Sequence, residues 1–318
     1  MTAIQTTGKK LYIQEVSVRD GFQIEPRFVP TEQKIELINA LSRTGLAKIE
    51  VTSFTSPKAI PNLADAEAVM SQIDRVAGVV YAVLVPNVRG CERALACGVD
   101  EINLFMSASP THNLANLRMT QEQSIAQFEQ VVRYAEGRAA INASLSTAFG
   151  CPFDGEVPER LVLDLVQRYL DMGITAVSLC DTTGMANPAQ VQRLCSQVRE
   201  RWPDLVLTAH FHDTRAMGLA NVLAALRAGI DRFDASLGGL GGCPFAPGAS
   251  GNVCTEDMVH MLEAMGYDTG VNLEQLIEIS RLLPDIVGHD VPGQVAKAGP
   301  YTRRYPVPES VRALTGAH

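Results

Sequence analysis

Eight short apolar runs, each followed by a stretch with helical spacing, constrain the fold of this chain more than any other feature. The runs, many of them rich in β-branched residues, read LYIQEVSV, KIEVTS, GVVYAVLV, EINLFMS, INASLSTA, AVSLCD, LVLTAHFH and RFDASLGG. Amphipathic stretches begin near Thr31, Asn62, Val88, Thr120, Pro158, Pro188 and Met217. Eight strands that alternate with helices predict an α/β fold, a (β/α)8 TIM barrel, with a doubly wound open sheet as the alternative.

The same pattern gives the expected domain organisation. No linker rich in Pro, Gly or Ser divides the chain, so we expect a single domain over residues 1–318. The barrel is expected to span about residues 10–245. A lid loop and additional C-terminal helices are expected over about residues 238–290, with a tail at 291–318.

Composition narrows the class of protein. The chain is 46% hydrophobic and 19% charged, which suits a soluble protein with a large core. The net charge of −8 argues against nucleic acid as the main partner. No apolar run approaches the roughly 18 residues of a membrane span, and MTAIQTTGKKLYIQ lacks the apolar segment of a signal peptide. Seven cysteines without zinc-type pair spacing predict a cytoplasmic protein with free thiols.

His210 and His212 lie at the C-terminal end of the seventh predicted strand, in TAHFHDTRAMG. Side chains alternate across a strand, so both imidazoles are expected to point the same way. The pattern H-x-H is short, and two histidines that are hydrogen-bonded at a strand end are the alternative to a metal site. In a (β/α)8 barrel, however, the active site is built at the C-terminal ends of the strands.

Polar residues lie in or just after several other predicted strands: Arg19, Asp20 and Gln23 at the end of the first, Glu50 within the second, Asp181 at the end of the sixth and Asn252 beyond the eighth. Strands one, seven and eight are neighbours in a closed barrel, so Asp20, the two histidines and Asn252 are expected to meet at its mouth. This nitrogen and oxygen set suits Mg²⁺ or Mn²⁺, although imidazoles also accept Fe, Zn or Co. Two histidines and one carboxylate also occur in non-haem iron oxygenases, a rival class of enzyme.

The glycine-rich segment SLGGLGGCPFAPGASGN follows the eighth predicted strand and contains Cys243. Glycine allows close approach to a ligand, so this segment is expected to act as a lid over the barrel mouth. It lacks the Gly-Lys-Ser/Thr ending of a phosphate-binding P-loop. Its position favours a reactive thiol for Cys243 over an inert core residue.

Six motifs together resemble the hydroxymethylglutaryl-CoA lyase family over about residues 10–290: VRDGFQ, IEVTSFTSPK, FGCPFDG, CDTTGMANP, HFHDT and GGLGGCPFAPGASGNVCTED. RDG is shared by a wider group of metal-dependent barrels that cleave or form carbon–carbon bonds, whereas the cysteine loop is specific to the lyases. The resemblance implies a single catalytic domain that cleaves 3-hydroxy-3-methylglutaryl-CoA to acetyl-CoA and acetoacetate. It also implies an acyl-CoA thioester as partner and a homodimer.

The resemblance further implies a role for each candidate residue. A divalent cation, Mg²⁺ or Mn²⁺, would be bound by Asp20, His210, His212 and Asn252. Arg19 would stabilise the enolate oxygen of the departing thioester, and Cys243 would take part in proton transfer to the enolate. Glu50, Gln23 and Asp181 would support the metal-bound substrate or the proton transfers.

The chain departs from the family's commonest pattern beside these residues. Phe22, Ile24 and Pro26 stand where Leu, Asn and Lys are usual, and Arg215 replaces a Tyr. Every implied metal ligand remains, but Arg215 is expected to bind a substrate carboxylate or the CoA phosphates. A related ester such as citramalyl-CoA is therefore an alternative substrate. A Claisen-condensing enzyme of the same superfamily and a barrel that only binds CoA esters are alternative functions.

Overall fold

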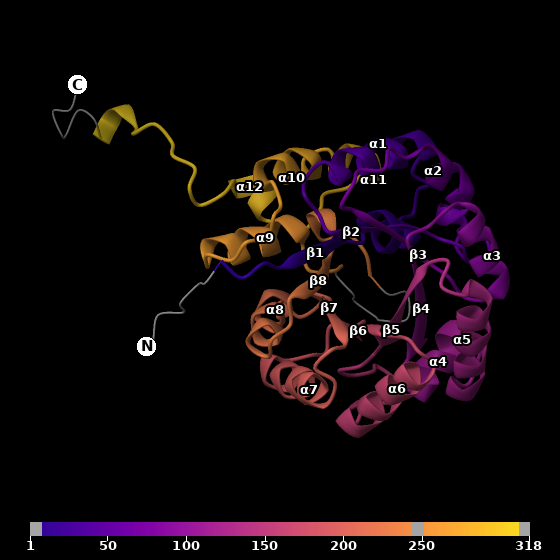
Figure 1. Cartoon of the computed structure of the whole chain (residues 1–318). Helices are drawn as coiled ribbons and strands as arrows, with labels where there is room; N and C mark the ends of the chain where they lie inside the picture. The colour runs from indigo at the N-terminus through magenta and orange to yellow at the C-terminus, as the bar shows by residue number, and fades with distance from the viewer. Residues whose placement is uncertain (1–7, 243–250, 312–318) are drawn as a thin grey trace.

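The computed structural model describes residues 8–242 and 251–311, and it confirms the predicted fold class. Eight parallel strands pair in sequence order, and β8 pairs with β1 to close the barrel. Figure 1 looks into the barrel, with helices around it. The strands are β1 (Tyr12–Glu15), β2 (Lys48–Ser53), β3 (Val80–Leu84), β4 (Glu101–Ser107), β5 (Ala140–Ser146), β6 (Ala176–Asp181), β7 (Val206–Phe211) and β8 (Arg232–Ala235).

Helices follow the strands close to the predicted positions. They are α1 (Thr31–Ser42), α2 (Ala66–Gln72), α3 (Val88–Ala96), α5 (Gln121–Ala135), α6 (Glu159–Asp171), α7 (Pro188–Arg201) and α8 (Gly218–Arg227). An additional helix, α4 (Pro110–Leu117), was not expected and precedes α5. Asn187 caps α7 as its sequence predicted, because its side chain accepts a hydrogen bond from the backbone N–H of Gln190.

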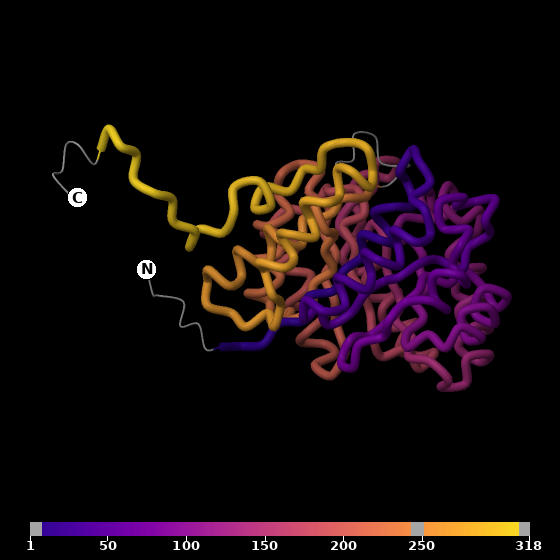
Figure 2. Tube along the Cα trace, turned by 90° about the horizontal axis from the view of Figure 1, so that it is seen from above, coloured from indigo at the N-terminus to yellow at the C-terminus, as the bar shows by residue number. Residues whose placement is uncertain are grey.

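In the described part of the chain, the barrel is followed by the helices α9 (Thr255–Ala264), α10 (Leu273–Ser280), α11 (Leu283–Val287) and α12 (Val295–Ala298). They lie on the side of the barrel where α1 and β1 are found (Figure 1). Part of the predicted tail is therefore packed, since α12 contacts α9 and Val291 is buried. The described chain beyond α12 runs away from the barrel (Figure 2). None of the described helices is long and apolar enough to cross a membrane.

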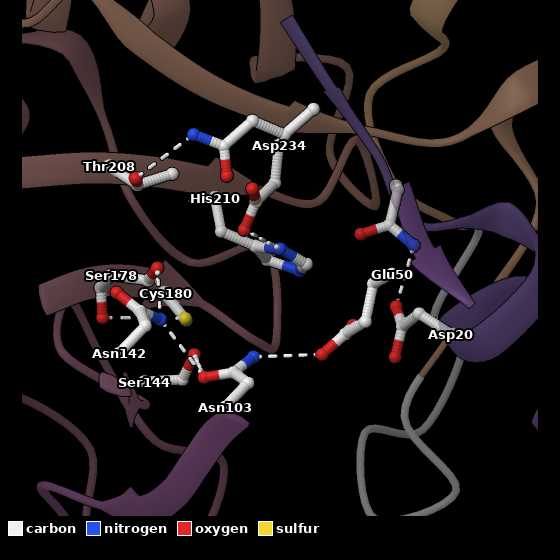
Figure 3. A network of polar contacts seen from close by, with 12 residues as sticks. Asp20, Glu50, Asn103, Asn142, Ser144, Ser178, Cys180, Thr208, His210 and Asp234 are labelled. Atoms are coloured by element: carbon white, nitrogen blue, oxygen red, sulfur yellow. Dashed lines mark hydrogen bonds and ion pairs between the residues drawn. The ribbon is translucent and has the colours of Figure 1, made fainter. Parts of the chain in front are cut away.

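The barrel strands separate an apolar outer layer from a polar interior. In β7, Leu207, Ala209 and Phe211 belong to the hydrophobic core, whereas Thr208 faces inward and accepts a hydrogen bond from Gln14 of β1. Figure 3 shows that hydrogen-bonded amides and hydroxyls line the inside of the barrel. Buried polar groups require such partners, so this interior fixes side chains in place beneath the barrel mouth.

The first strand is shorter than its apolar run predicts. β1 ends at Glu15, and a π-helical turn, η1 (Ser17–Gly21), follows it. The buried Glu15 carboxylate accepts hydrogen bonds from the backbone N–H of Ser17 and Leu237 and from the hydroxyl of Thr255. Burial raises the pKa of Glu15 to about 7. The end of β1 is thus tied to the chain after β8, and the turn η1 carries the first candidate residues.

Candidate active site

Asp20 in η1 and the two histidines of the β7 end come together at the mouth of the barrel. One potential ligand atom from each of Asp20, His210 and His212 lies within 4.8 Å of the other two. The Nε2 atoms of the histidines are 3.3 Å apart, and all three side chains are buried. The structure therefore brings the residues after strand one and strand seven together, as the barrel pattern predicts.

Two buried polar atoms beside this group have no hydrogen-bond partner among the described residues: Nδ1 of His212 and Oδ1 of Asn252. The amide nitrogen of Asn252 donates to Oδ2 of Asp20 at 2.7 Å, so this side chain lies against the carboxylate. Buried atoms without partners are rare in folded proteins. The combination of imidazole nitrogen, carboxylate oxygen and amide oxygen is a donor set that fits a divalent cation.

Glycines place Asn252 next to Asp20. Gly241 has φ +107°, and a Cβ added there would lie 2.5 Å from Nδ2 of Asn252. Gly251 has φ +70°, and a Cβ there would lie 1.9 Å from the carbonyl oxygen of Gly239. The described flanks of the glycine-rich segment are therefore packed against the candidate cation site. Cys243 and the middle of the predicted lid, residues 243–250, lie outside the described residues.

Arg19 lies beside Asp20 in the same turn and is held by two carboxylates. Its Nη1 is 2.6 Å from Oδ1 of Asp20, and its Nε donates to Oε2 of Glu50. Burial lowers the pKa of Arg19, but Glu50 and Asp20 outweigh that effect and raise it above its usual range. Burial raises the pKa of Asp20, but Arg19 and the two histidines outweigh it, so the pKa lies below its usual range. Arg19 is thus a permanent, fixed cation at the barrel mouth.

Glu50 of β2 is held in turn by a chain of polar residues from β4 and β5 (Figure 3). Its Oε1 accepts a hydrogen bond of 2.8 Å from Nδ2 of Asn103 in β4. The side-chain oxygen of Asn103, Oδ1, accepts two hydrogen bonds from residues of β5. The donors are Oγ of Ser144 at 2.8 Å and Nδ2 of Asn142 at 2.9 Å. Burial raises the pKa of Glu50. The position of Arg19 therefore depends on residues from β2, β4 and β5.

Asp234 of β8 orients His210, a contact that the sequence did not reveal. Its Oδ2 lies 3.2 Å from Nδ1 of His210, and the two residues are register partners. Burial lowers the pKa of His210, but Asp234 outweighs it and raises the pKa. Burial, followed by His210, lowers the pKa of His212 to about 4, which keeps this imidazole neutral. A carboxylate on the second ring nitrogen is typical of a histidine that binds a metal.

A cavity of about 900 Å³ opens above these residues at the C-terminal ends of the strands. Its inner end is lined by Arg19, Asp20, His210, His212 and Asp234, and by Gln23, Ser144 and Cys180. Its outer end is lined by the loops after β2 and β3 and by the end of α4. This volume is at the upper end of the range for small-molecule and cofactor sites.

Comparison with known proteins agrees with the motifs. A family model described as HMGL-like matches residues 10–283. The chain belongs to the HMGL-like family. Hydroxymethylglutaryl-CoA lyase YngG of Bacillus subtilis is 48% identical over 287 residues, which are 90% of this chain and 96% of that protein. The mitochondrial hydroxymethylglutaryl-CoA lyase of Homo sapiens is 38% identical over 298 residues, 93% of this chain and 92% of that protein.

Solved structures of HMG-CoA lyases share the fold. The enzyme of Acinetobacter baumannii, solved with coenzyme A and 3-methylmalate, is 54% identical to this chain, with a TM-score of 0.92. The match covers 97% of this chain and 100% of the Acinetobacter baumannii chain. The enzyme of Bacillus subtilis is 47% identical to this chain, with a TM-score of 0.89, and the match covers 91% of this chain and 98% of the Bacillus subtilis chain. The predicted family, barrel and class of enzyme, a carbon–carbon lyase, are confirmed.

Four predicted residues of this HMGL-like chain do not line the described part of the cavity: Glu50, Asp181, Arg215 and Asn252. Glu50 and Asn252 contact the lining residues Arg19 and Asp20, whereas Asp181 and Arg215 do not. Oδ1 of Asp181 accepts hydrogen bonds from the backbone N–H of Met185 and Ala186, and burial raises its pKa to about 7. Cys180 and Thr182 line the cavity instead, so Asp181 lies on the other face of its strand. Its catalytic role stays a prediction.

Arg215 is exposed and extends over the loop after β6. Its Nη1 donates to the carbonyl oxygens of Thr183 at 3.0 Å and Gly184 at 2.9 Å. Gln23, in contrast, lines the cavity and donates to Oδ1 of Asp20 at 3.0 Å. Of the two predicted substrate-binding residues, Gln23 has the geometry to contact a ligand in this cavity, and the role of Arg215 stays a prediction.

Proposed function

We propose that this chain is a divalent-cation-dependent lyase that cleaves 3-hydroxy-3-methylglutaryl-CoA to acetyl-CoA and acetoacetate by a retro-Claisen reaction. The observation that carries the proposal is the convergence of Asp20, His210 and His212 with a fixed Arg19 at the inner end of one cavity. Family membership and relatives named as HMG-CoA lyases support the choice of substrate.

Asp20, His210, His212 and Asn252 would hold Mg²⁺ or Mn²⁺, and that cation would supply the Lewis acidity that lowers the pKa of the substrate hydroxyl. Asp234 keeps His210 in a fixed ring orientation through its Nδ1. Gln23 keeps the Asp20 carboxylate in place and offers its own side chain to the bound acyl group. These residues of the chain would thus fix the position of the substrate hydroxyl for cleavage.

Cleavage of the carbon–carbon bond leaves the enolate of acetyl-CoA, whose oxygen is negatively charged. Arg19 lines the cavity and is the cation that would face this oxygen. Because Glu50 and Asp20 already fix its guanidinium, little reorganisation is needed when the charge develops. We assign Arg19 to enolate stabilisation and Glu50 to its support.

The enolate carbon must then accept a proton, and we assign this step to Cys243. Gly242, the residue that precedes Cys243 in the sequence, lines the cavity, which supports this assignment. A thiol is a side chain that can donate a proton to a reacting group in this way. Asp181 could affect proton transfer only through the loop after β6, given its contacts with Met185 and Ala186.

A related ester such as citramalyl-CoA is the second candidate substrate. It is favoured by the Acinetobacter baumannii relative, whose structure contains coenzyme A and 3-methylmalate, a hydroxy dicarboxylate. We also propose a cytoplasmic location and a homodimer. The six described cysteines are all free thiols, which supports a reducing compartment.

The test is a product assay with the purified protein and Mg²⁺ or Mn²⁺, in which HMG-CoA and citramalyl-CoA are compared. Release of acetyl-CoA and acetoacetate from HMG-CoA, and loss of that activity in EDTA, are the expected results. Turnover of citramalyl-CoA alone would keep the reaction type and change the substrate. Formation of free CoA from acetyl-CoA and a 2-oxo acid would identify a condensing enzyme instead.

A further inference from the structure

Cys180 is an exception in the polar wall that surrounds the candidate cation site. The lining residues supplied there by η1, β8 and the end of β7 all carry a charged group or an imidazole: Arg19, Asp20, His210, His212 and Asp234. Cys180, near the end of β6, lines the same cavity and is the register partner of His210. Figure 3 shows its sulfur among the polar side chains inside the barrel. A weakly polar side chain therefore lies next to a candidate cation ligand.

The thiol of Cys180 is suited to packing against a ligand rather than to proton transfer. Its Sγ donates to the carbonyl oxygen of Ser178 in the same strand at 3.6 Å. Burial, followed by the charge of Asp234, raises the pKa of this thiol well above its usual range, so the sulfur is uncharged at neutral pH. A neutral thiol behaves as a small hydrophobic group that forms only weak hydrogen bonds. Cys180 thus offers the cavity a small, nearly apolar surface.

The substrate of the proposed function has an alkyl group that must lie close to this surface. Its tertiary hydroxyl would lie at the cation held by Asp20, His210 and His212. The methyl group is bonded to the same carbon as that hydroxyl, so it lies near the cation as well. A methyl group buried against charged or amide groups would leave those groups without hydrogen bonds. Among the described lining residues around the cation site, Cys180 is the one that can cover a methyl group without this loss.

We infer that Cys180 packs against the alkyl group at carbon 3 of the acyl chain and limits that group to the size of a methyl. This inference rests on the proposed function and names a residue that selects among 3-hydroxyacyl-CoA esters. β6 is paired with β5 on one side and β7 on the other, so its backbone is not free to move away from a larger group. Protein interiors are close-packed, and one additional carbon atom in such a place causes a clash.

The test compares three CoA esters that differ only in the group at carbon 3, which is hydrogen in 3-hydroxyglutaryl-CoA, methyl in HMG-CoA and ethyl in 3-ethyl-3-hydroxyglutaryl-CoA. Cys180→Ala frees the space of the sulfur, so kcat/KM for the ethyl ester should rise roughly tenfold relative to the methyl ester. Cys180→Val is larger and branched, so kcat/KM for the methyl ester should fall roughly tenfold relative to the hydrogen ester. Ratios taken within one variant cancel any general loss of folded protein.

Two control variants separate the size of the side chain from other effects. Cys180→Ser keeps the size of the side chain and removes the sulfur, so it should keep the parent's ratio between the ethyl and methyl esters. A change in that ratio as large as in Cys180→Ala would mean that size is not what Cys180 controls. Cys195→Ala removes a buried thiol of α7 that does not line the cavity, and it should leave all the ratios unchanged.

An unchanged ratio in Cys180→Ala or in Cys180→Val would overturn the inference. If the parent cleaves none of the esters, the proposed function fails, and calorimetry with the intact esters and Mn²⁺ then decides the inference. Tighter binding of the ethyl ester relative to the methyl ester in Cys180→Ala than in the parent supports it. The same relative affinity in both proteins, or no binding of either ester, refutes it.

Discussion

The two ends of the cavity differ in the burial and the partners of their cationic side chains. At the inner end, Arg19 is buried and held by Asp20 and Glu50, and Glu50 is held by Asn103. At the outer end, the side chains of Lys58 and Arg118 are exposed and make no hydrogen bond or ion pair with the described residues. Both ends are lined by residues that follow barrel strands, so the difference lies in what packs behind each charge.

This difference separates catalysis from binding. A charge that stabilises a transition state is most effective when its position is fixed before the reaction, and burial among partners provides that. An exposed charge without fixed partners, as at the outer end, lacks this preorganisation. We therefore expect changes at the inner end to lower kcat or cation affinity.

The largest effect is expected at Arg19. Arg19→Met should lower kcat by roughly 10³-fold, because the enolate oxygen loses its fixed cation. Cation content and affinity for CoA should stay near those of the parent, because Arg19 supplies no ligand atom and lies at the inner end of the cavity. Steady-state kinetics, elemental analysis and calorimetry measure the three quantities.

Loss of Arg19 also leaves Glu50 buried without its counter-ion, which destabilises the fold on its own. The double variant Arg19→Met/Glu50→Gln controls for this. It should recover thermal stability and remain inactive. Recovery of activity together with stability would mean that Arg19 has only a structural role.

A smaller effect is expected at Asp234. Asp234→Asn removes the carboxylate from Nδ1 of His210 and should weaken Mn²⁺ binding by roughly 10- to 100-fold. Saturating Mn²⁺ should then restore much of the turnover. A titration of activity with Mn²⁺ distinguishes this result from a loss of kcat that no cation concentration reverses, which would contradict the orienting role.

The smallest effect concerns the stability of the inner end. The pKa of Glu15 is about 7 in the folded chain and near 4.5 when exposed. Between these values the folded state binds more protons than the unfolded state, so stability falls as pH rises from about 4.5 to 7. Glu15→Gln keeps the neutral form, and its melting temperature should fall less over this range. An unchanged pH dependence would show that Glu15 does not titrate in this way.

Local patterns in the sequence were sufficient to predict the strands and the two histidines. Alternation over LVLTAHFH depends only on neighbouring residues, and the structure places His210 and His212 on the same, inward face. The same alternation in AVSLCD indicates that Cys180 and Asp181 face opposite ways. That signal was available and would have argued against direct contact between Asp181 and the substrate.

Other features depend on contacts that no local pattern contains. β1 ends early because Glu15 binds groups 222 and 240 positions away. Asp234 meets His210 through the register of β7 and β8, which the sequence does not specify. Asn103 did carry a weak signal, since an amide within the apolar run EINLFMS needs a buried partner, and that partner is Glu50.

The central claim is that the residues from η1 and β7 form a cation site on which cleavage depends. The most direct measurement is Mn²⁺ content and HMG-CoA cleavage in the parent and in His212→Ala, purified side by side. The account predicts that the parent binds an equimolar amount of Mn²⁺, and that the variant loses cation and turnover together. Full Mn²⁺ content and normal cleavage in His212→Ala would contradict it.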